Sequence, residues 1–275
     1  MASSHHTSTA NLAAPGTIAS ANEEFFSNSG ESMLNQQWVK DVQVVMKKQL
    51  ENNIDWLGID TRDGPDGKKM LDYACGMGFL SKANIAPGMI KAYNSTAANL
   101  GLAPERMYGV HADLSNPNPT AQAGAGVSAV DLSSEDFSNF DFAGVALALH
   151  HIEHPQEAVS KIVERLRPGG VFLAIDRPAG ESGGDEGHAH GHGHGHGHGH
   201  GHSHDNDEDQ IDPSHPAAHT ISHAHASFSR EDVERMFKDA GLVDVELLYF
   251  DYRGEVAGLP KGAGRLFFAR GRKLE

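Results

Sequence analysis

The chain has 275 residues, which is enough for one α/β domain with a sizeable core plus tails or insertions. Its formal net charge is −15 at pH 7, which argues against a nucleic-acid partner because phosphate binding requires a basic face. The single cysteine excludes an intramolecular disulfide framework and fits a reducing compartment.

The sequence also argues against a membrane-spanning or exported protein. No apolar run approaches the roughly 20 residues that a membrane span requires. The N-terminal segment lacks a basic stretch followed by an apolar core, and no arginine precedes Arg62, so we expect neither a secretory signal nor a transit peptide. The expected location is the cytoplasm, with the nucleus as the alternative.

The chain begins with a polar tail and continues into an amphipathic segment. Residues 1–31 are rich in Ser, Ala, Thr and Asn and are predicted to be disordered. In residues 32–54, apolar side chains such as Met33, Trp38 and Leu50 recur at helical spacing, which predicts an amphipathic helix. This helix either packs on a sheet or covers a bound ligand. The folded domain is expected to span residues 32–275.

Residues 70–80, with the sequence MLDYACGMGFL, are the segment most informative about function. Residues 69–74 predict a short buried strand, and Gly76 and Gly78 allow the sharp turn that follows it. Asp72 directs a carboxylate to the same end of the strand, where open parallel α/β sheets bind nucleotides. Ser81 stands where the dinucleotide fingerprint requires a third glycine, which weakens the case for NAD or FAD.

The turn resembles motif I of the class I S-adenosylmethionine-dependent methyltransferases, of the form LDxxCGxG. Further motifs that resemble the small-molecule members of this family, such as those of ubiquinone biosynthesis, follow in order. They are NIAPGM at residues 84–89, an acidic loop at Asp113, LHHIEHP at 149–155 and RPGG at 167–170. The resemblance implies an α/β fold with a Rossmann-like methyltransferase sheet, mostly parallel and ending in a C-terminal antiparallel hairpin. It also implies S-adenosylmethionine as the cofactor.

One strand of that sheet is predicted to be missing. The segment NIAPGM begins eight residues after Gly76, and a parallel crossover needs about a dozen residues or more, so no room is left for the second strand. We expect another edge element to lie against the strand around Leu71, giving a sheet of six strands. The ribose-binding position, usually acidic in this family, is Asn84 here, which weakens the expected hydrogen bonding to the cofactor.

The resemblance also assigns cofactor contacts. Asp72, Gly76 and Gly78 would hold the methionine end. Asn84 and Met89 would hold the ribose and adenine, and Asp113 would meet the adenine amino group. The complete expected set of cofactor-binding residues is Asp72, Ala74, Cys75, Gly76, Gly78, Asn84, Ile85, Met89, Asp113, Leu114 and Leu149.

Apolar periodicity predicts the remaining elements. Helices are expected at residues 89–100, 155–166 and 229–240, and the last begins with a capping box formed by Ser229 and Asp232. Strands are expected at residues 106–111, 142–148, 170–175, 243–249 and 266–269. The strand at 243–249 is predicted to be exposed on one face.

His150 and His151 follow a predicted strand, at the end where ligands bind, and are the candidate catalytic residues. A neutral imidazole can take a proton from the methyl acceptor or shape its pocket. Two alternatives stay open. The histidines are ordinary loop residues that hydrogen-bond to the backbone, or no dedicated base is needed because methyl transfer mainly requires an in-line nucleophile.

Residues 179–218 are predicted to form a flexible insertion rich in His, Gly and Asp. Its histidines are candidate ligands for loosely bound Zn, Ni or Cu, without fixed geometry. They are His188, His190, His192, His194, His196, His198, His200, His202 and His204. No metal is expected to be required for activity, and expansion of a sequence repeat is the alternative explanation of the tract.

The motifs favour an enzyme that transfers a methyl group from S-adenosylmethionine to a small-molecule acceptor. Two alternatives remain: a catalytically impaired relative that acts as a binding protein, and a metal-binding protein that acts through its His tract. The shortened first crossover motivates the former, and residues 188–204 motivate the latter. Fold does not determine substrate, so the acceptor, the methylated atom and the oligomeric state stay open.

Overall fold

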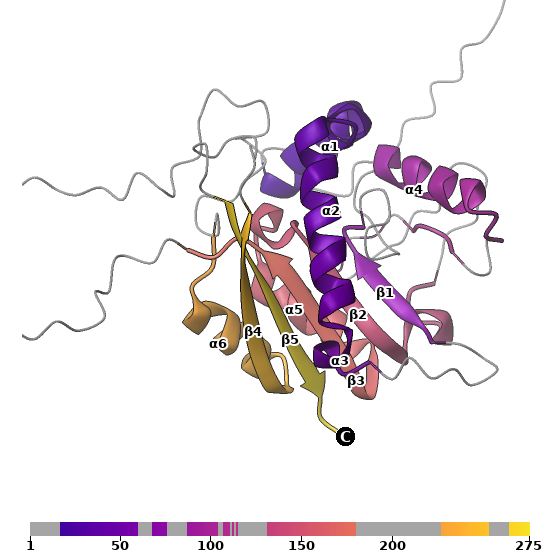
Figure 1. The fold of residues 1–275 in the computed structure, drawn as a ribbon. Helices are drawn as coiled ribbons and strands as arrows, with labels where there is room; N and C mark the ends of the chain where they lie inside the picture. Colours follow the sequence, from indigo (N-terminus) through magenta and orange to yellow (C-terminus); the bar gives the residue numbers. More distant parts are fainter. Residues whose placement is uncertain are drawn as a thin grey trace, which may run out of the picture.

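A computed structural model shows an α/β protein in which helices flank a twisted sheet (Figure 1). The structure describes residues 17–59, 68–75, 87–103, 107–110, 112, 114, 131–179, 227–252 and 264–275. The strands are β1 (Met70–Tyr73), β2 (Phe140–Ala146), β3 (Leu166–Asp176), β4 (Leu242–Tyr252) and β5 (Gly264–Lys273). The helices are α1 (Ile18–Leu34), α2 (Gln37–Asn52), α3 (Ile54–Leu57), α4 (Pro87–Asn99), α5 (Pro155–Glu164) and α6 (Arg230–Asp239). Two short 3-10 turns are η1 (Glu135–Phe137) and η2 (Leu149–His151).

The five strands of the sheet lie in the order β1-β2-β3-β5-β4. β1 pairs in parallel with β2, and Leu71 lies opposite Ala143. β2 pairs in parallel with β3, whereas β5 runs antiparallel to both β3 and β4. A parallel half followed by an antiparallel C-terminal pair confirms the predicted fold class. This topology also brings the carboxyl ends of β1, β2 and β3 to one edge of the sheet.

Helix α2 covers one face of the sheet. Val42 and Met46, four residues apart on one side of the helix, are each 3% exposed. They share a buried cluster with Leu57 and with alternate residues of the strands. The strand residues of this cluster are Phe142, Val171, Leu173, Ile175, Leu266 and Phe268. Packing on the sheet, one of the two roles expected for the amphipathic segment, is therefore confirmed for α2.

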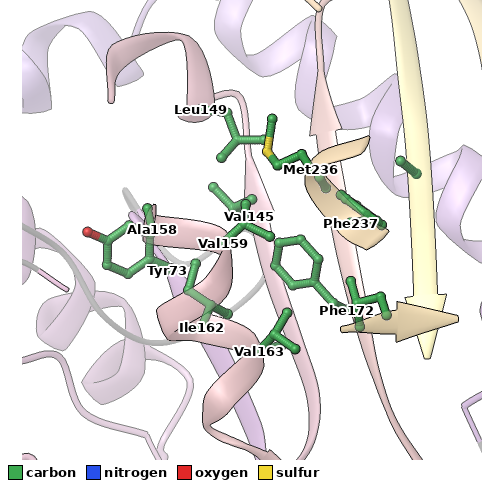
Figure 2. Close-up of a cluster of buried hydrophobic side chains, with 14 of the residues drawn as sticks. Tyr73, Val145, Leu149, Ala158, Val159, Ile162, Val163, Phe172, Met236 and Phe237 are labelled. Atoms are coloured by element: carbon green, nitrogen blue, oxygen red, sulfur yellow. The ribbon is translucent and has the colours of Figure 1, made fainter. Parts of the chain in front are cut away.

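Helices α5 and α6 cover the opposite face. Figure 2 shows Val145 and Phe172 of the sheet among side chains of these helices, including Ile162 and Phe237. All four side chains are fully buried, and burying an apolar side chain of this size contributes about 1.5–3 kcal/mol. The two-sided core therefore holds the parallel strands in the register that positions their carboxyl ends.

The N-terminal region is helical where the sequence predicts disorder. Helix α1 begins at Ile18, inside the expected tail, and Gln36 is extended, with φ −66° and ψ 147°, before α2 begins. The prediction of disorder is therefore wrong from Ile18 onward, and the single helix expected over residues 32–54 is two elements. Composition failed here because α1 contacts α4 and η2, and such tertiary packing outweighs local propensity.

The described part of the chain forms five strands, not the six that the sequence predicts. Residues 107–110, inside the expected strand at 106–111, are not a strand and pack through side chains instead. Met107 lies in a cluster with Tyr93 and Ala97 of α4. A strand must pair with a neighbouring strand to satisfy its backbone hydrogen-bonding groups. Among the described strands, β1 pairs with β2 and no other, so residues 107–110 do not extend the sheet beside β1. The segment with the predicted deletion, residues 76–86, lies outside the described residues.

The second half of β4 is covered on both faces, although the sequence predicts one exposed face. Leu248 and Phe250 pack on the same cluster as α2. From α3, Trp56 Nε1 donates a hydrogen bond to Glu246 Oε2 at 2.8 Å. The expected exposed face is therefore confirmed at Asp244 and Glu246, which are exposed, and is wrong at Leu248, which packs on the cluster that α2 shares.

None of the helices among the described residues combines the length and apolarity needed to cross a membrane.

Candidate functional site

The carboxyl ends of the three parallel strands bring together residues that are far apart in the sequence. Asp72 in β1 is 1% exposed. β2 leads into η2, which carries Leu149, His150 and His151. β3 ends at Asp176, which is 0% exposed. Because these strands run parallel, the groups lie along one edge of the sheet, where α/β folds bind ligands.

His150 and Asp176 form a buried hydrogen-bonded pair. The ring Nδ1 of His150 lies 2.7 Å from Asp176 Oδ1. The backbone N–H of Arg177 donates to the same oxygen at 2.8 Å. An ionised carboxylate only accepts hydrogen bonds, so Nδ1 carries the proton that His150 donates. In the neutral ring, Nε2 is then the nitrogen that can accept a proton.

Asp176 is held ionised in spite of its burial. Burial alone would raise its pKa, but the neighbouring His150 and the hydrogen bonds from His150 and the Arg177 backbone favour the carboxylate. The net result is a pKa of Asp176 below its usual value. A buried carboxylate that orients a histidine in this way is the arrangement by which hydrolytic triads place a proton-accepting ring.

Helix α1 lies over the two histidines. Asn22 is 2% exposed, and its Nδ2 donates to the backbone oxygen of His151 at 2.7 Å. One turn further along α1, Phe26 packs edge-on against the His151 ring with centroids 5.3 Å apart. The rings of His150 and His151 are 4.2 Å apart. Figure 1 shows α1 and α4 near the carboxyl-terminal edge of the parallel strands, so α1, not α2, covers this region.

The described cofactor candidates near β1 fall into two clusters. Leu114 and Leu149 are buried in the large core cluster together with residues of β1. Cys75 packs instead with Tyr93 and Ala97 on the side of α4. The end of β1 therefore lies between an apolar wall from η2 and a second wall from α4.

Ala74 has an unusual backbone conformation at the point where the chain leaves β1. Its φ is 56°, in the left-handed region that disfavours residues with a Cβ atom. The chain thus turns two residues after the buried Asp72, whereas the turn predicted at Gly76 and Gly78 lies outside the described residues. The strained residue, however, is Ala74, which precedes the glycines Gly76 and Gly78.

These residues suit the cofactor that the sequence implies. S-adenosylmethionine carries two cationic groups, an ammonium and a sulfonium, and a buried carboxylate such as Asp72 favours positive charge nearby. Leu114 and Leu149 are buried in the core cluster that includes residues of β1, so they line the apolar interior behind the end of this strand. In the described part of the site, the charge of Asp72 therefore fits the cofactor.

Of the remaining predicted site residues, the structure describes the position of Met89, which lies in the first turn of α4. Outside the described residues lie Gly76, Gly78, Asn84, Ile85, Asp113 and the nine histidines of residues 188–204. Within the described residues, no group of three or more His, Cys, Asp or Glu side chains is placed to hold a metal ion. The roles of these residues stay predictions.

Sequence reasoning missed two residues of the site. Asp176 ends a buried strand next to the strand that leads to His150, so its position in a parallel sheet was the available signal. Asn22 offered no such signal, because it lies in a polar segment without apolar periodicity. Its burial becomes visible only in the folded protein.

Sequence comparison identifies relatives of this chain. The family model described as "Methyltransferase domain" matches residues 71–174. Over 194 residues the chain is 23% identical to an uncharacterized methyltransferase of Schizosaccharomyces pombe, covering 66% of this chain and 56% of that protein. Over 126 residues it is 30% identical to a ubiquinone biosynthesis O-methyltransferase of Pseudomonas fluorescens, covering 45% of this chain and 50% of that protein. The chain thus spans about half the length of these curated relatives.

Structural comparison gives the same fold. The magnesium protoporphyrin IX methyltransferase of Synechocystis PCC 6803, solved with bound SAM, has a TM-score of 0.55 to this chain. The two are 12% identical, and the match covers 96% of this chain and 99% of that chain. At this level of identity the similarity shows the fold.

Proposed function

We propose that the chain, whose residues 71–174 match the family model described as "Methyltransferase domain", transfers a methyl group from S-adenosylmethionine to a small-molecule acceptor. The observation that carries the proposal is the oriented His150–Asp176 pair, which lies at the same edge of the sheet as Asp72. A carboxylate can bind the cationic cofactor, and an oriented base can take the proton that a hydroxyl group loses on methylation. This edge of the sheet holds a candidate for each role.

In the proposed reaction, Asp72 and the turn after β1 hold the cofactor, and Leu114 and Leu149 contact its apolar parts. Bound S-adenosylmethionine would supply the methyl group on an electrophilic sulfonium. The protein's main contribution is to hold the acceptor close and in line, which is the largest requirement of such a transfer.

His150 would remove the proton that the acceptor loses. Because Asp176 holds the Nδ1 proton, Nε2 is the nitrogen that accepts a proton from an acceptor hydroxyl. Asp176 then stabilises the ring when it becomes positively charged, as a buried carboxylate does in hydrolytic triads. His151 would shape the acceptor site beside it, since the two rings lie 4.2 Å apart.

A hydroxyl on a small molecule is the acceptor that best matches this arrangement. A hydroxyl must lose its proton on methylation, and an oriented base serves that need. The Pseudomonas fluorescens relative is described as an O-methyltransferase, which supports the same type of acceptor. The net charge of −15 supports a small molecule over a nucleic acid. The proposed mechanism includes no metal ion.

A catalytically impaired relative is the second candidate. β1 ends at Tyr73 and α4 begins at Pro87, so residues 74–86 connect them. A parallel crossover alone needs about a dozen residues or more, so a connection of this length is too short for a crossover helix followed by a second strand. If cofactor binding is lost for this reason, the protein would act as a binding protein with a methyltransferase fold.

A transfer assay distinguishes the two candidates. The purified protein is incubated with methyl-labelled S-adenosylmethionine and a panel of phenols and hydroxy acids, and labelled products are identified by mass spectrometry. We expect labelled methyl ethers or esters, and a much lower yield from the His150→Gln variant. Cofactor binding without any labelled product would favour the impaired relative.

A further inference from the structure

Asn22 of α1 has a side chain that is buried and fixed in orientation. It is 2% exposed. Its Nδ2 donates two hydrogen bonds, to the backbone oxygen of Ile18 at 2.9 Å and to that of His151 at 2.7 Å. Rotating the amide would point Oδ1 at these two carbonyl oxygens, so the assignment of the nitrogen and oxygen atoms is determined.

The oxygen of the same amide has no such partner. Asn22 Oδ1 is buried and accepts no hydrogen bond within the described part of the chain. Buried side-chain polar atoms are rarely left unsatisfied in folded proteins, and each exception calls for an explanation. An acceptor atom held in place by two donated bonds is ready to receive a donor from a bound molecule.

The residues around Asn22 indicate what kind of molecule could supply the hydrogen-bond donor. Asn22 and Phe26 are four residues apart on one face of α1, and both contact His151 of η2. His150 lies next to His151, so Asn22 is close to the residue that the proposed function assigns to the methyl acceptor. The rings of Phe26 and the two histidines favour a flat, ring-containing ligand.

We propose that Asn22 Oδ1 accepts a hydrogen bond from a second, non-reacting hydroxyl group of the methyl acceptor. This inference rests on the proposed function, in which His150 takes the proton of the reacting hydroxyl. Asn22 is then a specificity-determining residue that selects acceptors with two hydroxyl groups. An acceptor with one hydroxyl leaves the buried oxygen unsatisfied and binds more weakly.

The test compares ligands that differ by one hydroxyl. Catechol, resorcinol and phenol are titrated into the full-length protein in the presence of S-adenosylhomocysteine, and each Kd is measured by calorimetry. In the wild type we expect at least one diphenol to bind about tenfold more tightly than phenol, the effect of one well-placed hydrogen bond. In Asn22→Ala we expect the diphenols and phenol to bind equally.

Two control variants separate this role from a structural one. Asn28→Ala removes an exposed asparagine from the same helix, and Phe26→Leu weakens the contact of α1 with His151 without changing Asn22. Both should keep the preference for a diphenol, even if Phe26→Leu weakens all three ligands together.

Three results would overturn the inference. The first is that the wild type shows no preference for a diphenol over phenol, and the second is that the preference survives in Asn22→Ala. The third is that Phe26→Leu loses the preference as completely as Asn22→Ala does. The titration of S-adenosylhomocysteine tests the proposed function separately. Without that binding, the proposed function and this inference both fail. With it, a missing preference removes the inference alone.

Discussion

At the scale of single residues, the His150–Asp176 pair is the part of the site that the structure defines most fully. Both side chains are buried and joined at 2.7 Å. The sequence identifies His150 because it follows an apolar strand in a recognisable motif. It could not identify Asp176 as the partner, because their pairing depends on β2 and β3 lying side by side. The unpartnered oxygen of Asn22 was equally invisible in the sequence, since burial of that polar residue comes from tertiary packing.

Replacing Asp176 should impair the proposed proton transfer. In Asp176→Asn the amide no longer fixes the Nδ1 proton or stabilises a charged ring. We expect kcat for methyl transfer to fall about 100-fold with little change in KM, within the range usual for general-base catalysis. Steady-state kinetics with the acceptor found in the labelled-product assay measures this. Asp239→Asn, an exposed aspartate in α6, is the matched control, and equal rates in both variants would contradict the role of Asp176.

The lowered pKa of Asp176 also predicts how stability depends on pH. A carboxyl whose pKa is lower in the folded state contributes stability that is fully present above its unfolded pKa, about 3.9, and lost as pH falls toward the folded value. The wild type should therefore lose free energy of unfolding between about pH 5 and pH 3, and Asp176→Asn should lose less over the same interval. Urea unfolding at both pH values measures the difference. A variant with the same acid sensitivity as the wild type would argue against the ionised carboxylate.

At the scale of elements, apolar periodicity predicted the helices that pack on the sheet but not the one that covers the site. α2, α5 and α6 present apolar stripes, and α6 begins with the predicted capping box, in which Ser229 and Asp232 each bond to the other's backbone. Helix α1 is folded because it packs against α4 and η2. No local sequence pattern encodes these tertiary contacts. The prediction of a strand at residues 106–111 was wrong for a related reason. A strand requires a neighbouring strand to pair with, and apolar residues alone do not provide one.

The packing of α2 predicts a large difference between two neighbouring positions. Met46 is 3% exposed and lies against the sheet, whereas Val44 is 67% exposed. Met46→Ala should lower the free energy of unfolding by about 2–5 kcal/mol, because a buried side chain is lost and leaves a cavity. Val44→Ala should change it by less than about 0.5 kcal/mol. Chemical unfolding of both variants measures the two values, and similar values would show that α2 does not pack as described.

At the scale of the whole molecule, the described sheet has its parallel half at one end, with β1 as the last strand. The sequence predicted the parallel strands because each is a buried apolar run between turn signals, and it predicted the antiparallel pair from the family resemblance. The number of strands could not be predicted, because the sequence does not say which segment pairs with the free edge of β1. The deletion predicted after Gly76 is next to the proposed cofactor-binding residues, so cofactor binding is the property that such a deletion would affect most directly.

Calorimetric titration of the wild-type protein with S-adenosylmethionine tests this account most directly. Asp72 is buried near the end of β1, the chain turns at Ala74, and the buried Leu114 and Leu149 pack in the same cluster as β1. We therefore expect saturable 1:1 binding with a Kd in the micromolar range. Asp72→Asn should weaken that binding, because it removes the charge proposed to face the cationic cofactor. The absence of binding heat at millimolar S-adenosylmethionine would contradict the account and leave a methyltransferase fold with another role.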